Sequence, residues 1–396
     1  MSRIFHVYAS NGPADQELDL PASDYEMLDL MERLRLKPGA PPYLEVLEYH
    51  DYDYLAEQLQ EQADIYQLNG LARKLAGLDD FGRAAFEGLV GMEIQKGAGP
   101  VPLPRLIDFA NSPECCHVVE EAMTDYELGR FYAENGFVSE AEDLTDEAFE
   151  LLDFRKIGQE YRTSDGGVFT SLGYVMKHSE VPHLSETMDF QPHKPPYTIQ
   201  LNTMSLPLTP CPKRDPIPIQ LPAPSEQLQE TLEKLGCTSW SNTMVSILDC
   251  PLPAWNHKIF LDEEIPQVFK LAEQLRQLEA NGKLVKYKDV LEAADCQDVA
   301  EAVLLAETVD DYNLLPDIRT VEEAAKDDLR ISIDEITLGR RLPHINLQSY
   351  GLEMLERYNA QLTGYGQIGR EDGQLVQTQH PEAPENTRQF GMEMMQ

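Results

Sequence analysis

Short stretches of alternating apolar and polar residues open the chain and recur near residue 200. In IFHVYA, which starts at Ile4, and YTIQLNTM, which starts at Tyr197, apolar side chains occupy every second position, which predicts β-strands. A helical pattern follows the first strand, with Met27, Leu30 and Leu34 at spacings of three and four. The segments YLEVLEY and MVSILD then predict one further strand in each half of the chain.

Ser23 is the predicted N-cap of the first helix, because Asp24 and Glu26 place acids in the turn that follows it. Beyond the second predicted strands, helical periodicity interrupted by turns dominates both halves. The Gly-rich segment DGGVFTSLGYV, from Asp165 to Val175, predicts a final strand or turn. Strands followed by helices, twice over, favour an α+β fold over a doubly wound parallel sheet.

Four pairs of segments recur in the same order in the two halves. LPASDYEMLDLMERL matches LPAPSEQLQETLEKL at a shift of 201 residues, and LARKLAGL matches LAEQLRQL at a shift of 200. LPRLIDFANSPE matches YKDVLEAADCQD at a shift of 184. IGQEYRTSDGGVFTSLGYV matches YGLEMLERYNAQLTGYGQI at a constant 193, which pairs Gly158 with Gly351. An ordered set of this kind indicates a duplicated unit.

The repeat predicts an elongated, multi-module chain of two tandem related units, each with a small strand-containing module followed by mainly helical modules. A Pro-rich polar stretch between the units is typical of a linker, and the last residues lack periodicity and predict a mobile tail. The predicted boundaries are 1–62 and 63–180 for the first unit, 181–196 for the linker, 197–260 and 261–372 for the second unit, and 373–396 for the tail.

Acidic residues greatly outnumber basic ones. The 396 residues include 69 Asp and Glu against 32 Lys and Arg, a net charge of −37, while 42% hydrophobic residues indicate a folded chain. Such a charge opposes compaction through self-repulsion and repels the phosphates of nucleic acids, so direct nucleic-acid binding is not expected. A solvated acidic surface, as in halophile proteins, is the alternative interpretation of the charge alone.

The acids concentrate in corresponding parts of the two halves. Residues 101–153 hold 14 acids and two bases, and residues 289–335 hold 15 acids and three bases, a net of −12 in each segment. On a helix, the acids between residues 142 and 150 fall on one face and repeat each turn of roughly 5.4 Å, against ~3.4 Å for the phosphates along a DNA strand. Such a row could stand in for phosphates, and a solvated helix face is the alternative.

The predicted partner-binding carboxylates are Asp125, Glu127, Glu134, Glu140, Glu142, Asp143, Asp146, Glu147, Glu150, Asp153, Asp310, Asp311, Glu322 and Glu323.

No catalytic motif appears in the sequence. Walker, GxGxxG, GxSxG and HExxH patterns are missing, and His178 and His183 have no further cysteine or histidine ligand beside them, so no metal or cofactor is expected. In so acidic a chain, carboxylate-only metal sites stay open. The six cysteines show no CxxC spacing, no apolar run approaches 18 residues and the N-terminus lacks an apolar signal core, so a cytoplasmic, non-enzymatic protein is expected.

Several ordered segments of residues 1–180 resemble the ArdA family of antirestriction proteins. They are the Leu-Asn-x-Leu-Ala stretch from Leu68 to Ala72, Leu128-Gly129-Arg130, the segment LLDFRKIGQEY with Leu151, Leu152, Asp153, Ile157 and Gly158, and the Gly-Gly-x-Phe-Thr run from Gly166 to Thr170.

The resemblance implies an elongated, curved, dimeric mimic of bent B-form DNA that occupies the DNA-binding groove of type I restriction-modification enzymes and is carried by mobile genetic elements. LLDFRKIGQEY corresponds to the family's antirestriction motif. This chain departs from the family in being about twice the usual length. Its second half also lacks the Gly-Gly-Phe run and has Pro343 and His344 near the motif position.

Charge and resemblance together predict a DNA-mimic inhibitor of a host defence complex, with a type I restriction-modification enzyme as the first partner and another nucleic-acid-guided nuclease as the second. Whether the protein acts as a homodimer or as a one-chain pseudo-dimer stays open, as does a role for the second unit. The alternatives are a non-mimic protein-interaction adaptor of a mobile genetic element and an enzyme with a carboxylate-bound metal.

Overall fold

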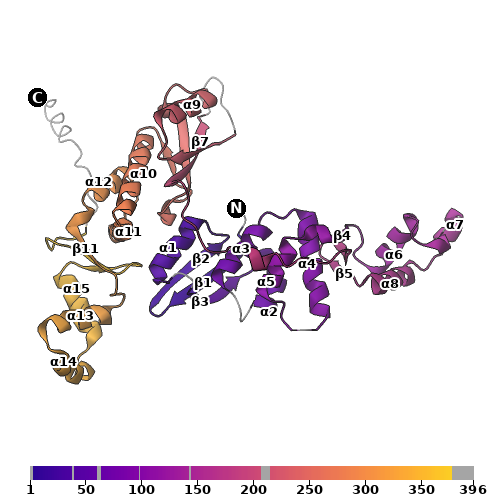
Figure 1. Cartoon of the computed structure of the whole chain (residues 1–396), viewed down its shortest axis with the longest axis horizontal. Coiled ribbons are helices and arrows are strands. Elements are labelled where there is room, and N and C mark those ends of the chain that lie inside the picture. Colours follow the sequence, from indigo (N-terminus) through magenta and orange to yellow (C-terminus); the bar gives the residue numbers. More distant parts are fainter. Residues whose placement is uncertain are drawn as a thin grey trace, which may run out of the picture. The chain divides into compact units, whose positions relative to one another are not determined.

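The computed structural model describes residues 3–37, 40–59, 64–97, 99–141, 144–206 and 215–376 (Figure 1). The chain forms two compact units. The first comprises Met1–Ser10, Asp15–Ala22 and Lys37–Pro192, and the second comprises Asn11–Ala14, Ser23–Leu36 and His193–Gln396. Helices alternate with small sheets whose strands pair antiparallel, so the prediction of an α+β protein is confirmed.

The first unit begins with a three-stranded sheet in the order β2-β1-β3. Its strands are β1 (Phe5–Asn11), β2 (Ala14–Leu20) and β3 (Tyr43–Glu48). Phe5, Val7 and Ala9 are fully buried while the residues between them are half-buried, as the alternating sequence pattern predicted.

Helices and a second small sheet complete the middle of the first unit. The sheet has the order β4-β6-β5 and packs on α4, where Gly88 faces Val175 so closely that an added Cβ would lie 2.5 Å from it. The elements are α2 (Ala56–Leu59), α3 (Ile65–Leu75), α4 (Asp80–Gln95), α5 (Leu103–Ala110), β4 (Cys116–Val119), β5 (Val168–Thr170) and β6 (Gly173–Lys177). The Gly-rich segment, predicted to be a strand or turn, forms an antiparallel hairpin of β5 and β6.

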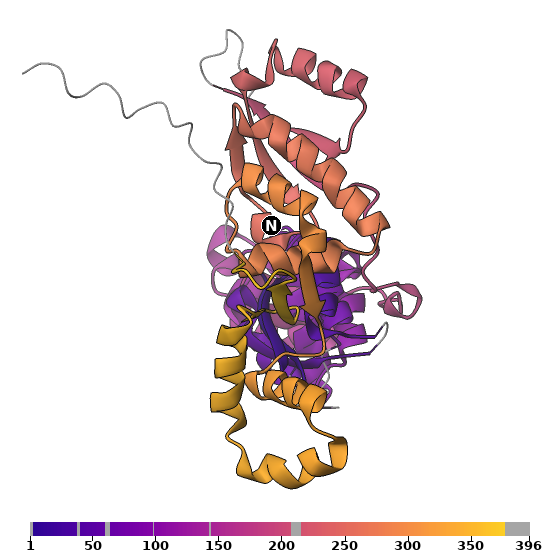
Figure 2. The ribbon, with the colours of Figure 1, turned by 90° about the vertical axis from the view of Figure 1, so that its left-hand side faces the viewer.

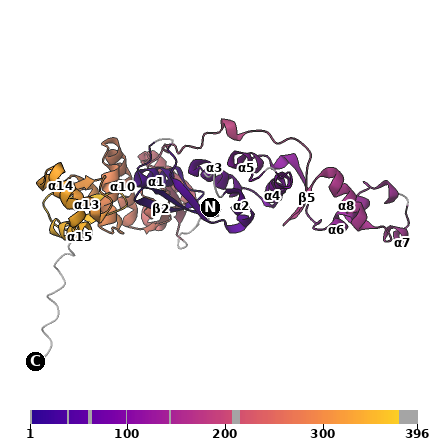
Figure 3. The same ribbon diagram turned by 90° about the horizontal axis from the view of Figure 1, so that it is seen from below.

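Three helices form the terminal module of the first unit: α6 (Asp125–Glu134), α7 (Asp146–Phe149) and α8 (Phe154–Asp165). Helices α6 and α8 lie side by side (Figure 3). Their backbones touch at two glycines, because a Cβ on Gly158 would lie 1.8 Å from the carbonyl oxygen of Asp125 and a Cβ on Gly129 would lie 1.8 Å from that of Phe154. Only glycine permits this approach.

The second unit contains helix α1 and a four-stranded sheet in the order β10-β9-β7-β8. Ser23 caps α1 in a capping box with Glu26, which confirms the predicted N-cap. The elements are α1 (Asp24–Leu34), β7 (Ile199–Ser205), β8 (Ile217–Leu221), α9 (Ser225–Leu235), β9 (Thr243–Asp249), β10 (Ile259–Leu261), α10 (Glu264–Ala280), α11 (Leu284–Ala293) and α12 (Val299–Glu307).

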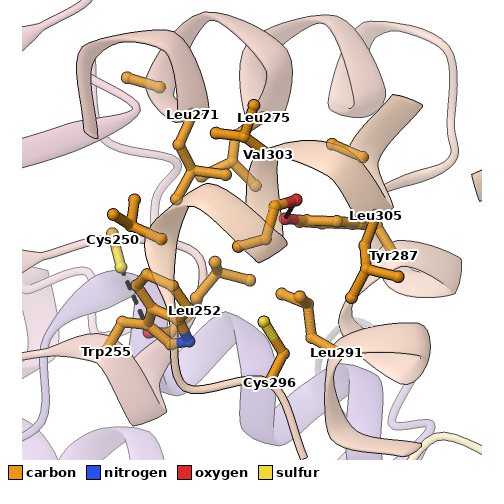
Figure 4. Packing of buried hydrophobic residues seen from close by; sticks show 14 of the residues in the cluster. Cys250, Leu252, Trp255, Leu271, Leu275, Tyr287, Leu291, Cys296, Val303 and Leu305 are labelled. Atoms are coloured by element: carbon orange, nitrogen blue, oxygen red, sulfur yellow. Dashed lines mark hydrogen bonds between the residues drawn. The ribbon is translucent and has the colours of Figure 1, made fainter. Parts of the chain in front are cut away.

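The core of the second unit lies between this sheet and helices α10 to α12 (Figure 4). Leu271 and Leu275 of α10 point into it, and Trp255 is 3% exposed. The buried hydroxyl of Tyr287 donates to the carbonyl of Ala302 at 2.6 Å, which satisfies the polar end of a large core side chain.

A buried ion-pair network fixes α1 within the second unit. Lys288 Nζ, whose side chain is 4% exposed, lies 2.7 Å from Asp29 Oδ1 and 2.6 Å from Glu32 Oε2. Tyr365 donates to the same Asp29 oxygen at 2.7 Å, and Arg33 Nε donates to the other at 2.9 Å. Breaking a buried pair leaves a charge uncompensated at a cost of about 3–5 kcal/mol. Replacing one partner of this buried ion pair should therefore destabilise the second unit.

The second unit ends in a small sheet, in the order β11-β13-β12, and three helices, which Figure 2 shows in orange and yellow. Helices α13 and α15 pack together, and Gly351 meets the carbonyl oxygen of Val321, where an added Cβ would lie 2.1 Å away. The elements are β11 (Tyr312–Leu315), α13 (Val321–Ser332), α14 (Glu335–Arg341), α15 (Leu347–Arg357), β12 (Gln361–Leu362) and β13 (Gln367–Arg370).

The sequence alignment at the shift of 184 is wrong. It places residues 103–114 opposite residues 287–298, which lie in α11 and the turn after it. In the first unit, however, a short 3-10 turn and strand β4 follow α5, and in the second unit the corresponding turn and strand follow α12. The short amphipathic patterns of α11 and α12 are similar enough that the sequence match paired α5 with α11, the helix before α12.

Part of the predicted linker packs on the first unit. Ser185 is buried, and its backbone N–H donates to the buried carboxylate of Asp108 at 2.8 Å. The ring of Phe190 lies against Gly70, where an added Cβ would be 2.5 Å from it. Residues 377–396, most of the predicted tail, lie outside the described residues. Among the helices of the described segments, none has the length and apolarity needed to cross a membrane.

Substituting Gly158 by Ala should lower the free energy of unfolding by about 3 kcal/mol, because the new methyl group meets backbone that cannot move away cheaply. Gly339→Ala is the matched control, since it is also inside a helix but has no atom within 4 Å of the added Cβ. It should raise stability by about 0.5–1 kcal/mol. Urea unfolding followed by circular dichroism measures both, and equal effects would contradict the steric argument.

Asp289 of α11 is fully buried, and burial raises its pKa to about 7 against the opposing hydrogen bond from Thr363. Glu292 raises this pKa further, whereas Arg319 and Arg33 lower it. Because the folded chain then holds a proton that the unfolded chain has released, stability should fall as pH rises from about 4 towards 7.

Asp289→Asn should therefore be more stable than the wild type at pH 8 and should lose this part of the pH dependence. Asp310→Asn is a control of opposite sign, because the hydrogen bond with Lys283 lowers the pKa of Asp310 and its stabilisation is lost only as the solution becomes acidic. Urea midpoints between pH 5 and pH 8 decide the question. If the urea midpoints of wild type and Asp289→Asn changed with pH in parallel, the predicted role of Asp289 would be wrong.

Candidate functional site

The predicted carboxylates fall into groups with different roles. Glu142 and Asp143 lie outside the described residues, and the side chain of Glu140 is not described either. Of the others, some cap helices, some pair with bases and some are exposed without an ion pair. The sequence pattern could not separate these groups, because each requires the same residue types.

The single long acidic helix expected between residues 142 and 150 is not what the chain forms. Helix α7 is one turn, Asp146–Phe149, with Thr145 as its N-cap and Glu150 as its C-cap. The oxygen of Thr145 accepts from the N–H of Ala148 at 3.4 Å, which starts the helix at Asp146. The regular row of carboxylates at one per turn is therefore wrong for this segment.

Asp125 is an internal ion-pair partner rather than a free surface acid. Arg162 donates to both of its carboxylate oxygens, at 2.7 Å from Nε and 3.2 Å from Nη2, and this hydrogen-bonded pairing raises the pKa of Arg162. The bidentate geometry joins the start of α6 to the end of α8. It thus secures the helix crossing at Gly158.

Three more predicted acids satisfy backbone N–H groups at helix starts. Asp153 accepts from the N–H of Lys156 at 3.1 Å, and Glu127 accepts from that of Met123 at 2.8 Å. Glu323 closes the capping box of α13. These side chains determine where helices begin, and their charge favours the positive end of each helix dipole.

Three further acids are exposed but paired with bases. Arg130 binds both Glu134, at 2.7 Å, and Glu150, at 3.1 Å, and the hydrogen bond with Glu134 and the charge of Glu150 raise its pKa. Asp310 lies 2.7 Å from Lys283. In each case a partner cation compensates part of the negative field, so these acids present less charge to a ligand than their number implies.

The remaining predicted acids have no ion pair within the described residues. Asp146, Glu147 and Asp311 are exposed and Glu322 is half-buried. The structure adds two exposed, unpaired acids that the sequence analysis missed, Glu120 and Glu121, in the turn between β4 and α6. Their signal was their position, because two acids directly after the buried Val119 at the end of β4 are expected to face solvent.

The residues of the family-like motif surround a groove in the terminal module. Leu151 is 86% exposed, whereas Leu152 and Ile157 line a groove of about 480 Å³ together with Val138 and Tyr161. Gly158 is buried at the helix crossing. The motif therefore mixes two roles, since Gly158 shapes the fold and the leucines present apolar surface.

No three His, Cys, Asp or Glu side chains within residues 3–376, apart from the undescribed gaps, converge to hold a metal ion. Fold and surface together define an acidic, two-unit α+β protein that exposes carboxylates without an ion pair in the described segments. No protein-family model matches the chain, and no curated protein matches it either.

Neutralising a paired acid should destabilise the protein more than neutralising an exposed, unpaired one. Asp125→Asn should lower the free energy of unfolding by about 1–3 kcal/mol, because Arg162 loses a half-buried bidentate partner. Asp146→Asn should change it by less than about 0.5 kcal/mol, as is usual for an exposed site. Thermal melting of both variants tests the assignment, which fails if Asp146→Asn is the more harmful change.

Proposed function

We propose that this protein is a DNA-mimic inhibitor that occupies the DNA-binding groove of a host defence enzyme. The observation that carries the proposal is the set of exposed carboxylates without an ion pair, which includes Glu120, Glu121, Asp146 and Glu147 around the terminal module of the first unit. Among the described residues no base offsets their charge, and repulsion between like charges opposes folding. A basic groove that binds phosphates would attract them.

The resemblance of residues 1–180 to the ArdA family narrows the choice of target enzyme. A type I restriction-modification enzyme is the proposed target, and another nucleic-acid-guided nuclease is the second choice. In this proposal the protein is cytoplasmic, acts by occupancy rather than by turnover, and needs neither cofactor nor direct contact with nucleic acid.

We further propose that the two units are tandem copies of one ancestral unit. Both have an antiparallel sheet, a set of helices, a small three-stranded sheet and a three-helix terminal module in the same chain order. In both terminal modules a glycine of the last helix, Gly158 or Gly351, meets the carbonyl at the start of the first helix. Gly173 and Gly366 both have a left-handed φ, of 145° and 153°, beside a carbonyl of the neighbouring strand.

The duplication has not preserved the acidic surface equally. Around α7 the exposed acids Asp146 and Glu147 have no neighbouring base in sequence, whereas α14 ends in Arg340 and Arg341. In our proposal the first unit therefore supplies the stronger phosphate mimic, and the second unit has diverged.

The alternative function is a protein-interaction adaptor whose acidity only keeps it soluble. The two functions differ in one measurable property. A mimic and duplex DNA exclude each other from the target, and raising salt weakens both complexes. An adaptor binds its target whether or not DNA is present.

Reversing Glu120, Glu121, Asp146 and Glu147 to Lys should weaken displacement of labelled duplex DNA from a purified type I restriction enzyme by about a hundredfold or more, because each reversal replaces attraction by repulsion. The single change Asp146→Ala should weaken it by only about twofold. Fluorescence anisotropy competition gives both values.

The matched control reverses four acids of the second unit, which changes the net charge equally: Glu226, Glu230, Glu233 and Glu356. It should keep most of the inhibition. If the first variant is folded by circular dichroism and still displaces DNA as the wild type does, mimicry by this surface is wrong. Equal losses in both variants would show that bulk charge, and not this surface, is responsible.

A further inference from the structure

Two exposed leucines flank the unpaired acids of helix α7. Leu144, directly before the N-cap of the helix, is 38% exposed, and Leu151, in the turn after the helix, is 86% exposed. Asp146 and Glu147 lie between them and are exposed without an ion pair among the described residues. Apolar and acidic side chains therefore face solvent together on one short stretch, residues 144–151, which we call the α7 segment.

Apolar exposure in this module is not confined to the two leucines. Five large apolar side chains that are at least 38% exposed lie within residues 123–151, namely Met123, Tyr126, Phe137, Leu144 and Leu151. Single exposed apolar residues are normal on a protein surface, whereas several in one small module are typical of an interaction surface.

Contacts with α6 and α8 hold the α7 segment on its module. The ring of Phe149 lies 5.4 Å from that of Phe154 at the start of α8, and the ring of Tyr126 on α6 lies 5.6 Å from the same ring. Glu150 is ion-paired with Arg130 of α6 at 3.1 Å. Because Phe149 and Glu150 make these inward contacts, the leucines and the two unpaired acids are left facing solvent.

The charge around the leucines favours a basic partner. Residues 144–153 contain four acids and no base. The nearest bases along the chain are Arg155 and Lys156, and Lys156 lies 3.9 Å from Glu160. A second copy of this chain would bring the same acids against the segment, and an anionic membrane would repel it as well. A protein surface with basic and apolar side chains complements it.

We propose that the α7 segment binds the DNA-binding groove of the target enzyme through its leucines as well as its carboxylates, with Leu144 and Leu151 packed against apolar side chains at the edge of that groove. This contact rests on the proposed function and adds the apolar part of the recognition. Proteins contact the backbone of DNA chiefly through hydrogen bonds and charge. The leucines therefore supply a contact that the backbone of DNA does not offer.

Salt separates the two kinds of contact. The affinity of DNA for a protein falls steeply with salt, because binding releases counterions from the phosphates and added salt opposes that release. Pairs of carboxylates and bases are also screened by salt, whereas the burial of apolar surface does not depend on charge. The advantage of this protein over DNA should therefore grow between about 0.1 and 0.5 M NaCl.

Fluorescence anisotropy with the labelled full-length protein and a purified type I restriction enzyme, repeated across this salt range, tests the contact. Leu151→Ser should raise the dissociation constant about tenfold at every salt concentration and leave the salt dependence unchanged. Glu147→Gln should instead make the salt dependence less steep and have little effect at high salt. Leu151→Met should stay within about threefold of the wild type, because it keeps an apolar side chain of similar volume.

Ile259→Ser is the matched control, because Ile259 is 57% exposed on strand β10 of the second unit. It should change neither the dissociation constant nor its salt dependence. Circular dichroism should show both serine variants folded as the wild type is, since each replaced side chain is exposed.

Two results would overturn this contact and leave the proposed function intact: DNA displacement by Leu151→Ser equal to that of the wild type, or a loss confined to low salt. A change in the sedimentation coefficient of the free protein on Leu151→Ser would assign the leucine to contact between copies and would overturn it too. If the wild type displaces no DNA at any salt concentration, the proposed function fails and this contact fails with it.

Discussion

The scarcity of basic residues is the constraint on which the rest of this structure depends. With a net charge of −37, each lysine or arginine that enters the interior must compensate acids that water would otherwise solvate. Lys288 does so for both Asp29 and Glu32, and Arg162 does so for Asp125. These few cations connect segments distant in sequence, since α1 is joined to α11 in this way, and their loss leaves buried charge unpaired.

The same scarcity separates the acids into two populations. Where a carboxylate accepts a backbone N–H at a helix start, as Asp153 and Glu323 do, its charge stabilises local structure. Where no cation is paired with the carboxylate, as for Asp146 and Glu147 among the described residues, more of the charge remains available to a partner. A surface built from the second population would bind through many modest contributions, as DNA does through its phosphates.

Steric constraints act beside the electrostatic ones in the terminal modules. Gly158 and Gly351 each let a helix touch the backbone of its neighbour. Away from the crossing at Gly158, large side chains fill the contact, since Tyr132 of α6 stacks on Tyr161 of α8. Leu151, in the turn before α8, and Ile336, on α14, lie outside these contacts and are 86% and 73% exposed. The surfaces of these modules are therefore partly apolar, which suits contact with other proteins.

The sequence by itself determined the elements whose causes are local. Alternating apolar residues produced β1, and Ser23 with Glu26 started α1, because both depend only on neighbouring residues. Tertiary structure alone decided which acids are free, since Asp125 and Asp146 look alike in sequence and differ only in the nearby Arg162. It also decided that α7 is a single turn, and that the segment containing α1 belongs to the second unit, because Lys288, 259 residues from Asp29 along the chain, is where its charge is compensated.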